Sequence, residues 1–288
     1  MSASAEAIAP RRKLGRAATK LFSNRSAVFG GVLVSVFLLM AVLAPLLAPY
    51  DPFATSFTSI RKPPSAEFWL GTDELGRDIY TRMVYGARAS LMAGVVSVAI
   101  AVLVGVPFGL LAGFYGGWVD AIISRVTEAL LAIPFLILAI ALAAFLGPSL
   151  TNAMIAIGLS ATPIFVRLTR GQTLAVKTED YVEGARAIGL PNVLIMIRYI
   201  FPNVLPPIVV QATITIATAI IAEASLSFLG LGQQPPNPSW GSMLNTAKNF
   251  MTQAPWMSVF PGGAIFLVVL GFNLLGDGLR DALDPRDN

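Results

Sequence analysis

The side chains best suited to bind a polar solute and release it again lie within one long apolar stretch of the chain. They are neutral hydrogen-bonding groups, spaced three, four or seven residues apart: Gln211, Thr215, Thr218 and Ser225. This spacing places them on one face of a helix. Such a face could hydrogen-bond a passing amide without holding it, so it is a candidate translocation path. The alternative is that the same groups join neighbouring helices inside a membrane.

Glu223 is the one ionisable residue between positions 206 and 228. Ionisable groups inside a membrane are costly and are often functional. We expect Glu223 to belong to the candidate path, as a gate or a proton site. The alternative is that it pairs with a neighbour near the outer interface.

Cysteine and histidine are both absent from the chain. Disulfides, a thiol nucleophile, a serine–histidine triad and a histidine-based zinc site are therefore excluded within it. The G-x-x-x-x-G-K-[ST] loop that binds nucleotide phosphates is also missing. We predict that the chain is not an enzyme and has no catalytic residue, no metal site and no cofactor of its own.

The composition indicates an all-α polytopic membrane protein. Of the 288 residues, 55% are hydrophobic and only 12% are charged, and the mean hydropathy is +0.72, whereas soluble domains carry about 25% charge. Six apolar segments of about 20 residues are each long enough to cross a bilayer of about 30 Å. They are residues 27–48, 91–114, 125–146, 152–168, 206–228 and 259–279.

These spans predict a simple organisation with no soluble domain. It consists of an N-terminal tail over 1–26, a first helix with an outer loop over 27–90, a five-helix core over 91–279 and a C-terminal tail over 280–288. Three glycines recur every four residues and predict close helix packing: Gly105, Gly109 and Gly113. Three prolines predict kinks: Pro107, Pro134 and Pro163. Arg125 and Glu128, three residues apart, predict an ion pair.

Lysine and arginine are distributed unevenly over the predicted loops. With the N-terminus inside, fourteen of the 20 fall in cytoplasmic segments or adjoining helix ends, and six fall outside. Because cytoplasmic loops are enriched in these residues, we expect both termini in the cytoplasm. The net charge of +4 then reflects orientation in a lipid membrane rather than binding to nucleic acid.

One polar segment, residues 178–203, interrupts the apolar sequence. Asp180 as N-cap with Glu183 three residues later predicts a capping box and a helix over 181–188. Gly189 can take the left-handed conformation that ends this helix, and Pro191 blocks its continuation. A second helix over 193–200 should end before Pro202. The segment is either an ordinary surface loop or a contact site for a partner outside the membrane.

The same segment resembles the "EAA" loop of ABC-importer permeases. Glu183-Gly184-Ala185 is followed after three residues by Gly189 and after nine more by Tyr199-Ile200-Phe201-Pro202. In that family the loop is a coupling helix that fits a cleft on the cytoplasmic ATPase. The resemblance implies a coupling loop over about 171–203, with these ATPase contacts: Glu183, Gly184, Ala185, Arg186, Gly189 and Pro202. This sequence departs from the pattern in having Gly184 for alanine, and Tyr199 and Phe201 for isoleucine and leucine.

Further segments resemble the dipeptide, oligopeptide and nickel group of these permeases. They are residues 71–78, 85–91, 223–232 and 272–281, with Pro235-Pro236, Trp240-Gly241 and Asp284-Pro285. The resemblance runs from about residue 28 to the end and is strongest to the "C"-type subunit of dipeptide, D-alanyl dipeptide and glutathione importers. It implies a type I ABC importer transmembrane fold in the bacterial cytoplasmic membrane.

This resemblance also implies partners. They are a second homologous permease subunit, two ATP-binding-cassette ATPase domains that use ATP and Mg²⁺, and an extracytoplasmic substrate-binding protein. Residues 71–78 and 230–241 are turn-rich loops on the outer side and could form the docking surface of the binding protein. The candidate residues are Asp73, Glu74, Arg77, Asp78 and Trp240. The alternative is that these loops only brace helix ends.

The sequence leaves three functions open besides uptake of short peptides. The chain could belong to a nickel importer of the same group, although it has neither histidine nor cysteine to bind the metal. It could be an ion-coupled secondary transporter with Glu223 as the ion site. A membrane enzyme is the weakest alternative, because no dense carboxylate cluster stands at one depth.

Overall fold

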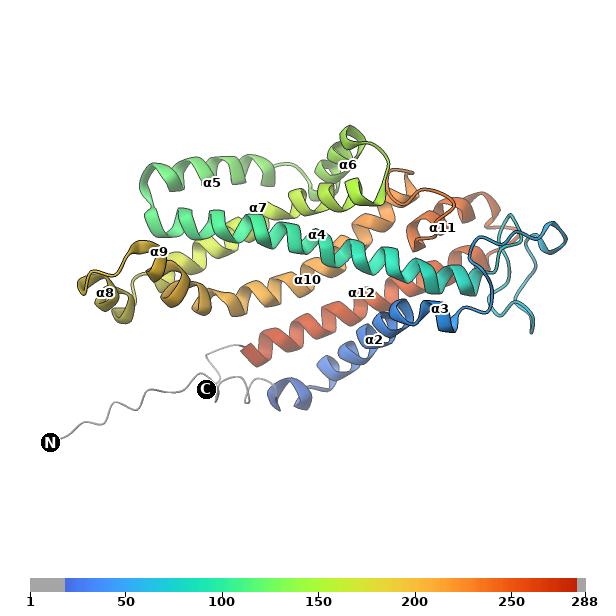
Figure 1. Ribbon diagram of the computed structural model, residues 1–288, viewed down its shortest axis with the longest axis horizontal. Coiled ribbons are helices and arrows are strands. Elements are labelled where there is room, and N and C mark those ends of the chain that lie inside the picture. The colour runs from blue at the N-terminus through green and yellow to red at the C-terminus, as the bar shows by residue number, and fades with distance from the viewer. Residues whose placement is uncertain (1–18, 284–288) are drawn as a thin grey trace.

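The computed structural model describes residues 19–283, and helices are the only named elements within that range (Figure 1). The long elements are α2 (Arg25–Val42), α4 (Ile79–Tyr115), α7 (Leu150–Val176), α10 (Phe201–Phe228) and α12 (Trp256–Leu283). The shorter helices are α3 (Ala44–Leu47), α5 (Gly117–Leu131), α6 (Phe135–Leu146), α8 (Asp180–Ala187), α9 (Asn192–Ile195) and α11 (Trp240–Ala247). Residues 49–78 and 229–239 are mostly irregular.

The centre of the molecule is the pair α4 and α7, which pack along each other for most of their length. The three glycines of α4 lie on this contact. A Cβ atom placed on Gly109 would lie 2.6 Å from the Cβ atom of Thr169, and one on Gly105 would lie 2.7 Å from the Cβ atom of Phe165. Such distances are too short for any side chain, so the predicted close packing is confirmed.

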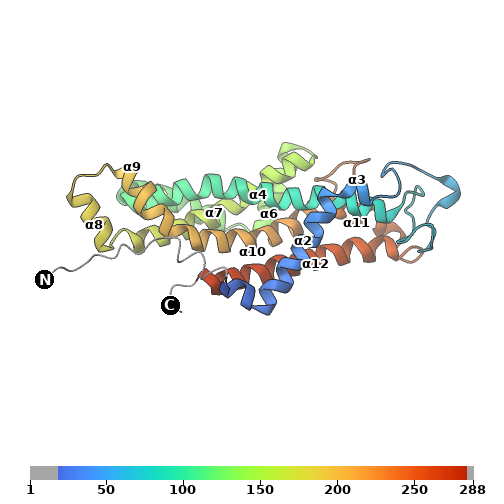
Figure 2. The same cartoon turned by 60° about the horizontal axis from the view of Figure 1, so that its bottom comes forward.

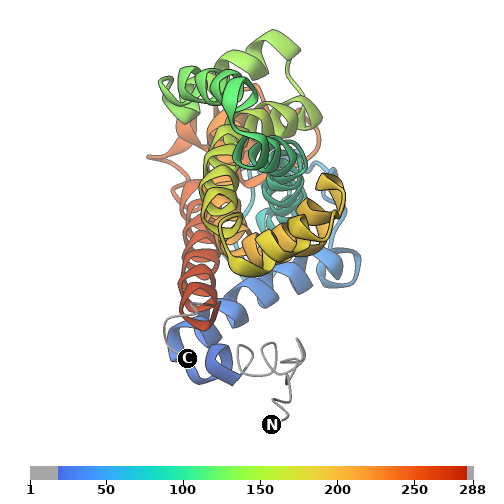
Figure 3. The ribbon, with the colours of Figure 1, turned by 90° about the vertical axis from the view of Figure 1, so that its left-hand side faces the viewer.

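α10 packs against α4, α7 and α12, and α2 packs against α12 (Figures 1 and 2). Close approach again depends on small residues, since a Cβ atom on Gly30 of α2 would lie 2.7 Å from the carbonyl oxygen of Gly271 in α12. One buried cluster joins α4, α7 and α10, and a second joins α2, α4, α11 and α12. α5 and α6 lie on the side of the molecule opposite α2 (Figure 3).

Five helices in the described range are long and apolar enough to cross a membrane, and α5 with α6 make a sixth if they form one span. This pair bends by 92°, so the predicted helix over 125–146 is wrong as a single element. Pro134 stands directly before α6, which places it at the break. Pro107 and Pro163 lie inside α4 and α7, and their kinks stay predictions.

α4 begins at Ile79, whereas the sequence placed its start near residue 91. Residues 79–86, predicted as loop, are helical. The cause is local, because the side chain of Asp78 accepts a hydrogen bond from the N–H of Thr81 at 2.8 Å and so caps the helix. The 37 residues of α4 therefore extend well beyond one bilayer thickness, at about 1.5 Å per residue.

A five-residue π-helix, Met196–Ile200, joins α9 directly to α10. The predicted helix end before Pro202 is therefore wrong, and Pro202 lies in the first turn of α10. Proline has no N–H to donate, so it interrupts the backbone hydrogen bonds of a helix. The wider turn of the π-helix just before Pro202 accommodates this interruption. The 193–200 segment is thus the beginning of one long continuous helical element.

The two ends of the molecule differ (Figure 1). α8 and α9 form one end, and the irregular segment 49–78 with α11 forms the opposite end. The beginning of α2 and the last turns of α12 lie together, since the side-chain amide of Asn24 donates to the carboxylate of Asp281 at 3.3 Å.

Candidate functional site

The first turn of α8 is closed by backbone hydrogen bonds rather than by the predicted capping box. It begins at Asp180, and its N-cap is Glu179, whose side chain makes no capping hydrogen bond. The carbonyl of Glu179 instead accepts from the N–H groups of Val182 and Glu183. The prediction that Asp180 caps the helix is therefore wrong. Gly189 does take the left-handed conformation, with φ of +79°, so the predicted helix end is confirmed.

The helical period divides the residues of α8 between two environments. Val182 and Ala185, three residues apart, are buried against the core of the molecule. Glu183, Gly184 and the other candidates Arg186, Gly189 and Pro202 are exposed. Ala185 is only 5% exposed, so its side chain faces the core and offers little surface to a partner in this conformation.

Several large apolar side chains in α8, α9 and the adjoining residues are also exposed. They are Tyr181, Ile188, Val193, Leu194 and Ile197. Ile188 is 75% exposed, which is unusual for so large an apolar side chain outside a lipid or protein interface. Sequence reasoning named the polar motif and missed these residues, although Val193 and Ile197 have the spacing of one helical face.

Three side chains fix this segment to neighbouring helices. Lys177 donates from its Nζ to the carbonyl oxygen of Gly113 at 2.7 Å, near the end of α4. The guanidinium of Arg186 lies 5.6 Å from the ring centre of Phe114. Arg170 binds Asp120 of α5 through two nitrogens, one of them at 2.7 Å. Of these three side chains, Arg186 connects α8 to the end of α4, whereas Lys177 and Arg170 connect the end of α7 to α4 and α5.

The four candidate path residues on α10 differ in how deeply they are buried. Thr215 is buried. Its hydroxyl accepts from the side-chain amide of Gln211 at 3.1 Å and donates to the backbone carbonyl of Gln211 at 2.7 Å. Thr218 and Ser225 are more open and donate to carbonyls of their own helix. Ser225 lines an open hollow together with Ile221 and Phe228 of α10, Leu244 of α11 and Ile265 of α12.

Glu223 lies away from that open face. Its side chain is fully buried, and its two oxygens accept hydrogen bonds from Ser90 of α4 at 3.0 Å and from Ser227 at 2.7 Å. The expected pairing with a neighbour therefore exists, but the partners are hydroxyl groups. Ser90 is 133 positions away in the chain, so no local pattern could have indicated it.

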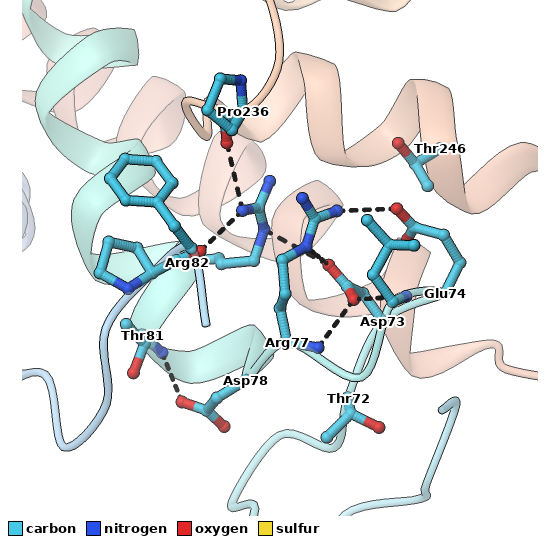
Figure 4. Close-up of polar contacts among 12 residues, drawn as sticks. Thr72, Asp73, Glu74, Arg77, Asp78, Thr81, Arg82, Pro236 and Thr246 are labelled. Atoms are coloured by element: carbon cyan, nitrogen blue, oxygen red, sulfur yellow. Dashed lines mark hydrogen bonds and ion pairs between the residues drawn. The ribbon is translucent and has the colours of Figure 1, made fainter. Parts of the chain in front are cut away.

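A cluster of charged side chains lies at the end opposite α8 (Figure 4). Arg77 binds Asp73 at 2.6 Å through its Nε and Glu74 at 2.7 Å through an Nη. Arg82 lies 3.5 Å from the same Asp73 oxygen, and one of its Nη atoms donates to the carbonyl of Pro52 at 2.9 Å and to that of Pro236 at 3.4 Å. Arg82 therefore links three segments that are far apart in the chain.

The electrostatics of this cluster follow from its burial. Loss of solvent, and next the neighbouring Asp73 carboxyl, raise the pKa of Glu74 above its usual value of 4.5, against the lowering effects of the two arginines. One oxygen of Glu74 and one of Asp78 are buried without a hydrogen-bond partner among the described residues.

Four of the five docking candidates are buried, namely Asp73, Arg77, Asp78 and Trp240. Asp78 caps α4, and the indole of Trp240 donates to the carbonyl of Met83 at 3.1 Å. At these positions the structure supports the bracing alternative rather than direct contact with a binding protein. Glu74 is half-buried, and Leu75 is exposed.

Comparison with known proteins agrees with this architecture. The family described as "Binding-protein-dependent transport system inner membrane component" matches residues 105–287, and "N-terminal TM domain of oligopeptide transport permease C" matches residues 14–64. A methionine ABC transporter solved in an inward-facing conformation shares the fold with a TM-score of 0.58, at 22% identity over 72% of this chain and 98% of that one.

Relatives in sequence cover nearly the whole chain. The dipeptide permease DppC of Alkalihalophilus pseudofirmus is 48% identical over 97% of this chain and 91% of its own length. A probable D,D-dipeptide permease, DdpC of Escherichia coli, is 46% identical over 90% and 87%, and the glutathione permease GsiD of Pectobacterium atrosepticum is 47% identical over 90% and 87%. The chain belongs to the family of binding-protein-dependent transport system inner membrane components, the multi-pass permease subunits of bacterial ABC importers.

Proposed function

We propose that this chain is the permease subunit of an importer that carries short peptides or peptide-like molecules. The observation behind this proposal is the near-full-length similarity to permeases named for dipeptides, D,D-dipeptides and glutathione. All three names denote solutes with amide bonds. The neutral hydroxyl and amide groups on α10 suit such solutes, because they can exchange hydrogen bonds with an amide without binding it tightly.

The energy for transport enters at the α8 end. ATPase subunits hydrolyse ATP with Mg²⁺ and press on the exposed surface formed by Glu183, Gly184, Ile188 and the apolar residues of α9 and the π-helix. The contacts from Lys177 to Gly113 and from Arg186 to Phe114 support this role, because they connect that surface to the end of α4. The chain itself contributes no catalytic residue and binds no cofactor.

The proposed orientation places α8 and both termini in the cytoplasm. The charged cluster and α11 then face outward, where a substrate-binding protein docks on the exposed parts of the 49–78 segment. A second homologous permease completes the pathway, because one set of six helices forms only half of it. The excess of lysine and arginine in the segments on the α8 side supports this orientation.

Growth and uptake experiments test the substrate. A strain that lacks this chain should fail to grow on di- and oligopeptides as sole nitrogen source, while its nickel uptake stays normal. Reintroduction of the parent chain should restore growth on peptides. Lost nickel uptake with intact growth on peptides would overturn the peptide assignment and favour the nickel alternative, while the permease assignment would stand.

A further inference from the structure

Glu223 lies where three parts of the chain meet. It belongs to α10, its partner Ser90 belongs to α4, and the segment from Gln233 to Trp240 passes over both. The carboxyl group is completely buried, and its two hydrogen-bonding partners at 3.0 Å and 2.7 Å are serine hydroxyls rather than cations.

Each of the two serine hydroxyls also accepts a hydrogen bond from the backbone. The N–H of Trp240 donates to the Ser90 hydroxyl at 3.3 Å, and the N–H of Gln233 donates to the Ser227 hydroxyl at 2.9 Å. A backbone N–H can only donate, and each hydroxyl has one proton. A hydroxyl can accept with its oxygen while its proton is donated elsewhere. Ser90 and Ser227 each accept from the backbone and donate to Glu223, so one carboxyl group is connected to two backbone positions 7 residues apart.

Close packing around the carboxyl group leaves little freedom for the segment. A Cβ atom on Gly241 would lie 2.5 Å from the carbonyl oxygen of Ala224, so α11 lies directly on α10. The Trp240 ring, fully buried, packs edge-on against Phe37 of α2 with 5.6 Å between ring centres. The N-terminal end of α11 is thus seated between α2, α4 and α10.

The position of α11 determines the shape of the open hollow beside α10. Leu244 of α11 forms one wall, Ile221 and Phe228 of α10 form another, and Ile265 of α12 forms a third. If α11 were released from α4, the first wall would move. Ser225, the polar residue of the candidate path in this hollow, would then have a different environment.

We propose that Glu223 is a positioning residue: through Ser90 and Ser227 it fixes the 233–240 segment and α11 against α4 and α10, and so sets the wall of the hollow. The effect on transport rests on the proposed function, because it requires the path to run along the open face of α10. The effect on local stability does not depend on that assignment.

Amide hydrogen exchange of the assembled complex, resolved to single residues, tests the positioning role. Glu223→Gln keeps the size of the side chain but has one acceptor oxygen instead of two, so at least one serine loses its acceptor. We expect exchange at Trp240 or Gln233, or at both, to become at least about tenfold faster, since loss of one partner in a buried hydrogen bond changes an equilibrium by about that factor or more.

Variants of the two serines test separately the two hydrogen-bonded connections from Glu223 to the backbone. Ser90→Ala should speed exchange at Trp240, and Ser227→Ala should speed it at Gln233. Ser97→Ala is the matched control, because Ser97 is also buried on α4 but donates to the carbonyl of Met154 in α7 at 3.0 Å. It should leave both amides unchanged.

Two results would overturn the positioning role. One is unchanged exchange at both amides in Glu223→Gln. The other is faster exchange in the serine variants alone, which would mean that the serines hold the segment without Glu223. Peptide uptake by the same complexes should be slower in Glu223→Gln at equal amounts of assembled protein. Faster exchange with normal uptake would leave the positioning role intact and would contradict a path along α10.

Discussion

Ala185 and Gly184 are neighbours in α8 with different environments. Ala185 is 5% exposed and packs into the core, whereas Gly184 is exposed, and apart from its own helix no heavy atom of residues 19–283 lies within 4 Å of the place its Cβ would occupy. A surface that meets an ATPase must therefore present Gly184 and its exposed neighbours. The inward methyl of Ala185 instead fixes the helix to its own chain.

This geometry predicts which positions can be crosslinked to the ATPase. The chain has no cysteine of its own, so single cysteines can be introduced without background. With a second cysteine in the ATPase cleft, Gly184→Cys and Ile188→Cys should form disulfides, while Ala185→Cys should not. Efficient crosslinking at Ala185 alone, or labelling of Gly184→Cys from outside intact cells, would contradict the proposed surface and its orientation.

The contact of α4 with α7 predicts a strong effect of side-chain size at one glycine. Gly109→Leu would place atoms where the Cβ atom alone already lies 2.6 Å from that of Thr169. We expect a loss of about 1–3 kcal/mol in the free energy of unfolding, as for overpacked cores. Gly171→Leu is the control, because nothing lies within 4 Å of its Cβ position. Thermal unfolding of both variants checks the difference, and equal melting temperatures would contradict the packing.

The ion pair between Asp120 and Arg170 predicts a measurable coupling between α5 and α7. Its side chains are 19% and 34% exposed, whereas those of the Arg125–Glu128 pair are 86% and 67% exposed at 3.7 Å. A double-mutant cycle with Asp120→Asn and Arg170→Gln should give a coupling free energy of about 1 kcal/mol. The same cycle on Arg125 and Glu128 should give a value near zero. A larger coupling free energy for the Arg125–Glu128 pair than for the Asp120–Arg170 pair would contradict this expectation.

The raised pKa of Glu74 predicts a pH dependence with a definite sign. A carboxyl group whose pKa is raised by folding binds its proton more readily in the folded state. Its contribution to stability is therefore greatest below the unfolded pKa, near 4.5, and falls as the pH rises through the folded pKa. Glu74→Gln removes the charge and keeps an oxygen for Arg77, so we expect this variant to gain stability relative to the parent as the pH rises above 4.5.

Melting temperatures at a series of pH values measure this gain. Glu67→Gln, at an exposed position outside the charged cluster, is the control and should show no such trend. A parent protein that gains stability relative to Glu74→Gln as the pH rises would show that the two arginines outweigh the effect of burial.

Hydropathy alone located the five long membrane helices, because a bilayer demands long apolar segments whatever their neighbours are, but it did not indicate the bend between α5 and α6. It failed at the start of α4, where Thr81, Arg82 and Tyr85 made residues 79–86 look like a loop. Arg82 is tolerated in a buried helix because Asp73 and the carbonyls of Pro52 and Pro236 surround it. The two carbonyls are 30 and 154 positions away in the sequence, so composition could not indicate them.

The candidate site likewise contains some features that the sequence predicted and others that it did not. The left-handed conformation of Gly189 followed from local chemistry, and the close packing at the glycines of α4 did as well. The burial of Ala185 and Trp240 depends on contacts with distant helices. The links from Asp120 to Arg170 and from Ser90 to Glu223 join residues 50 and 133 positions apart, and a single sequence has no pattern that pairs them.

Uptake of a labelled dipeptide into liposomes is the most direct test of the central claim that this chain is half of an ATP-driven pathway. The liposomes would contain the assembled permease pair and ATPases, with binding protein on the opposite side and no ion gradient. We predict uptake that requires ATP on the ATPase side and ceases without it. Uptake by this chain alone, or uptake driven by an ion gradient in the absence of ATP, would contradict the account and identify a secondary transporter.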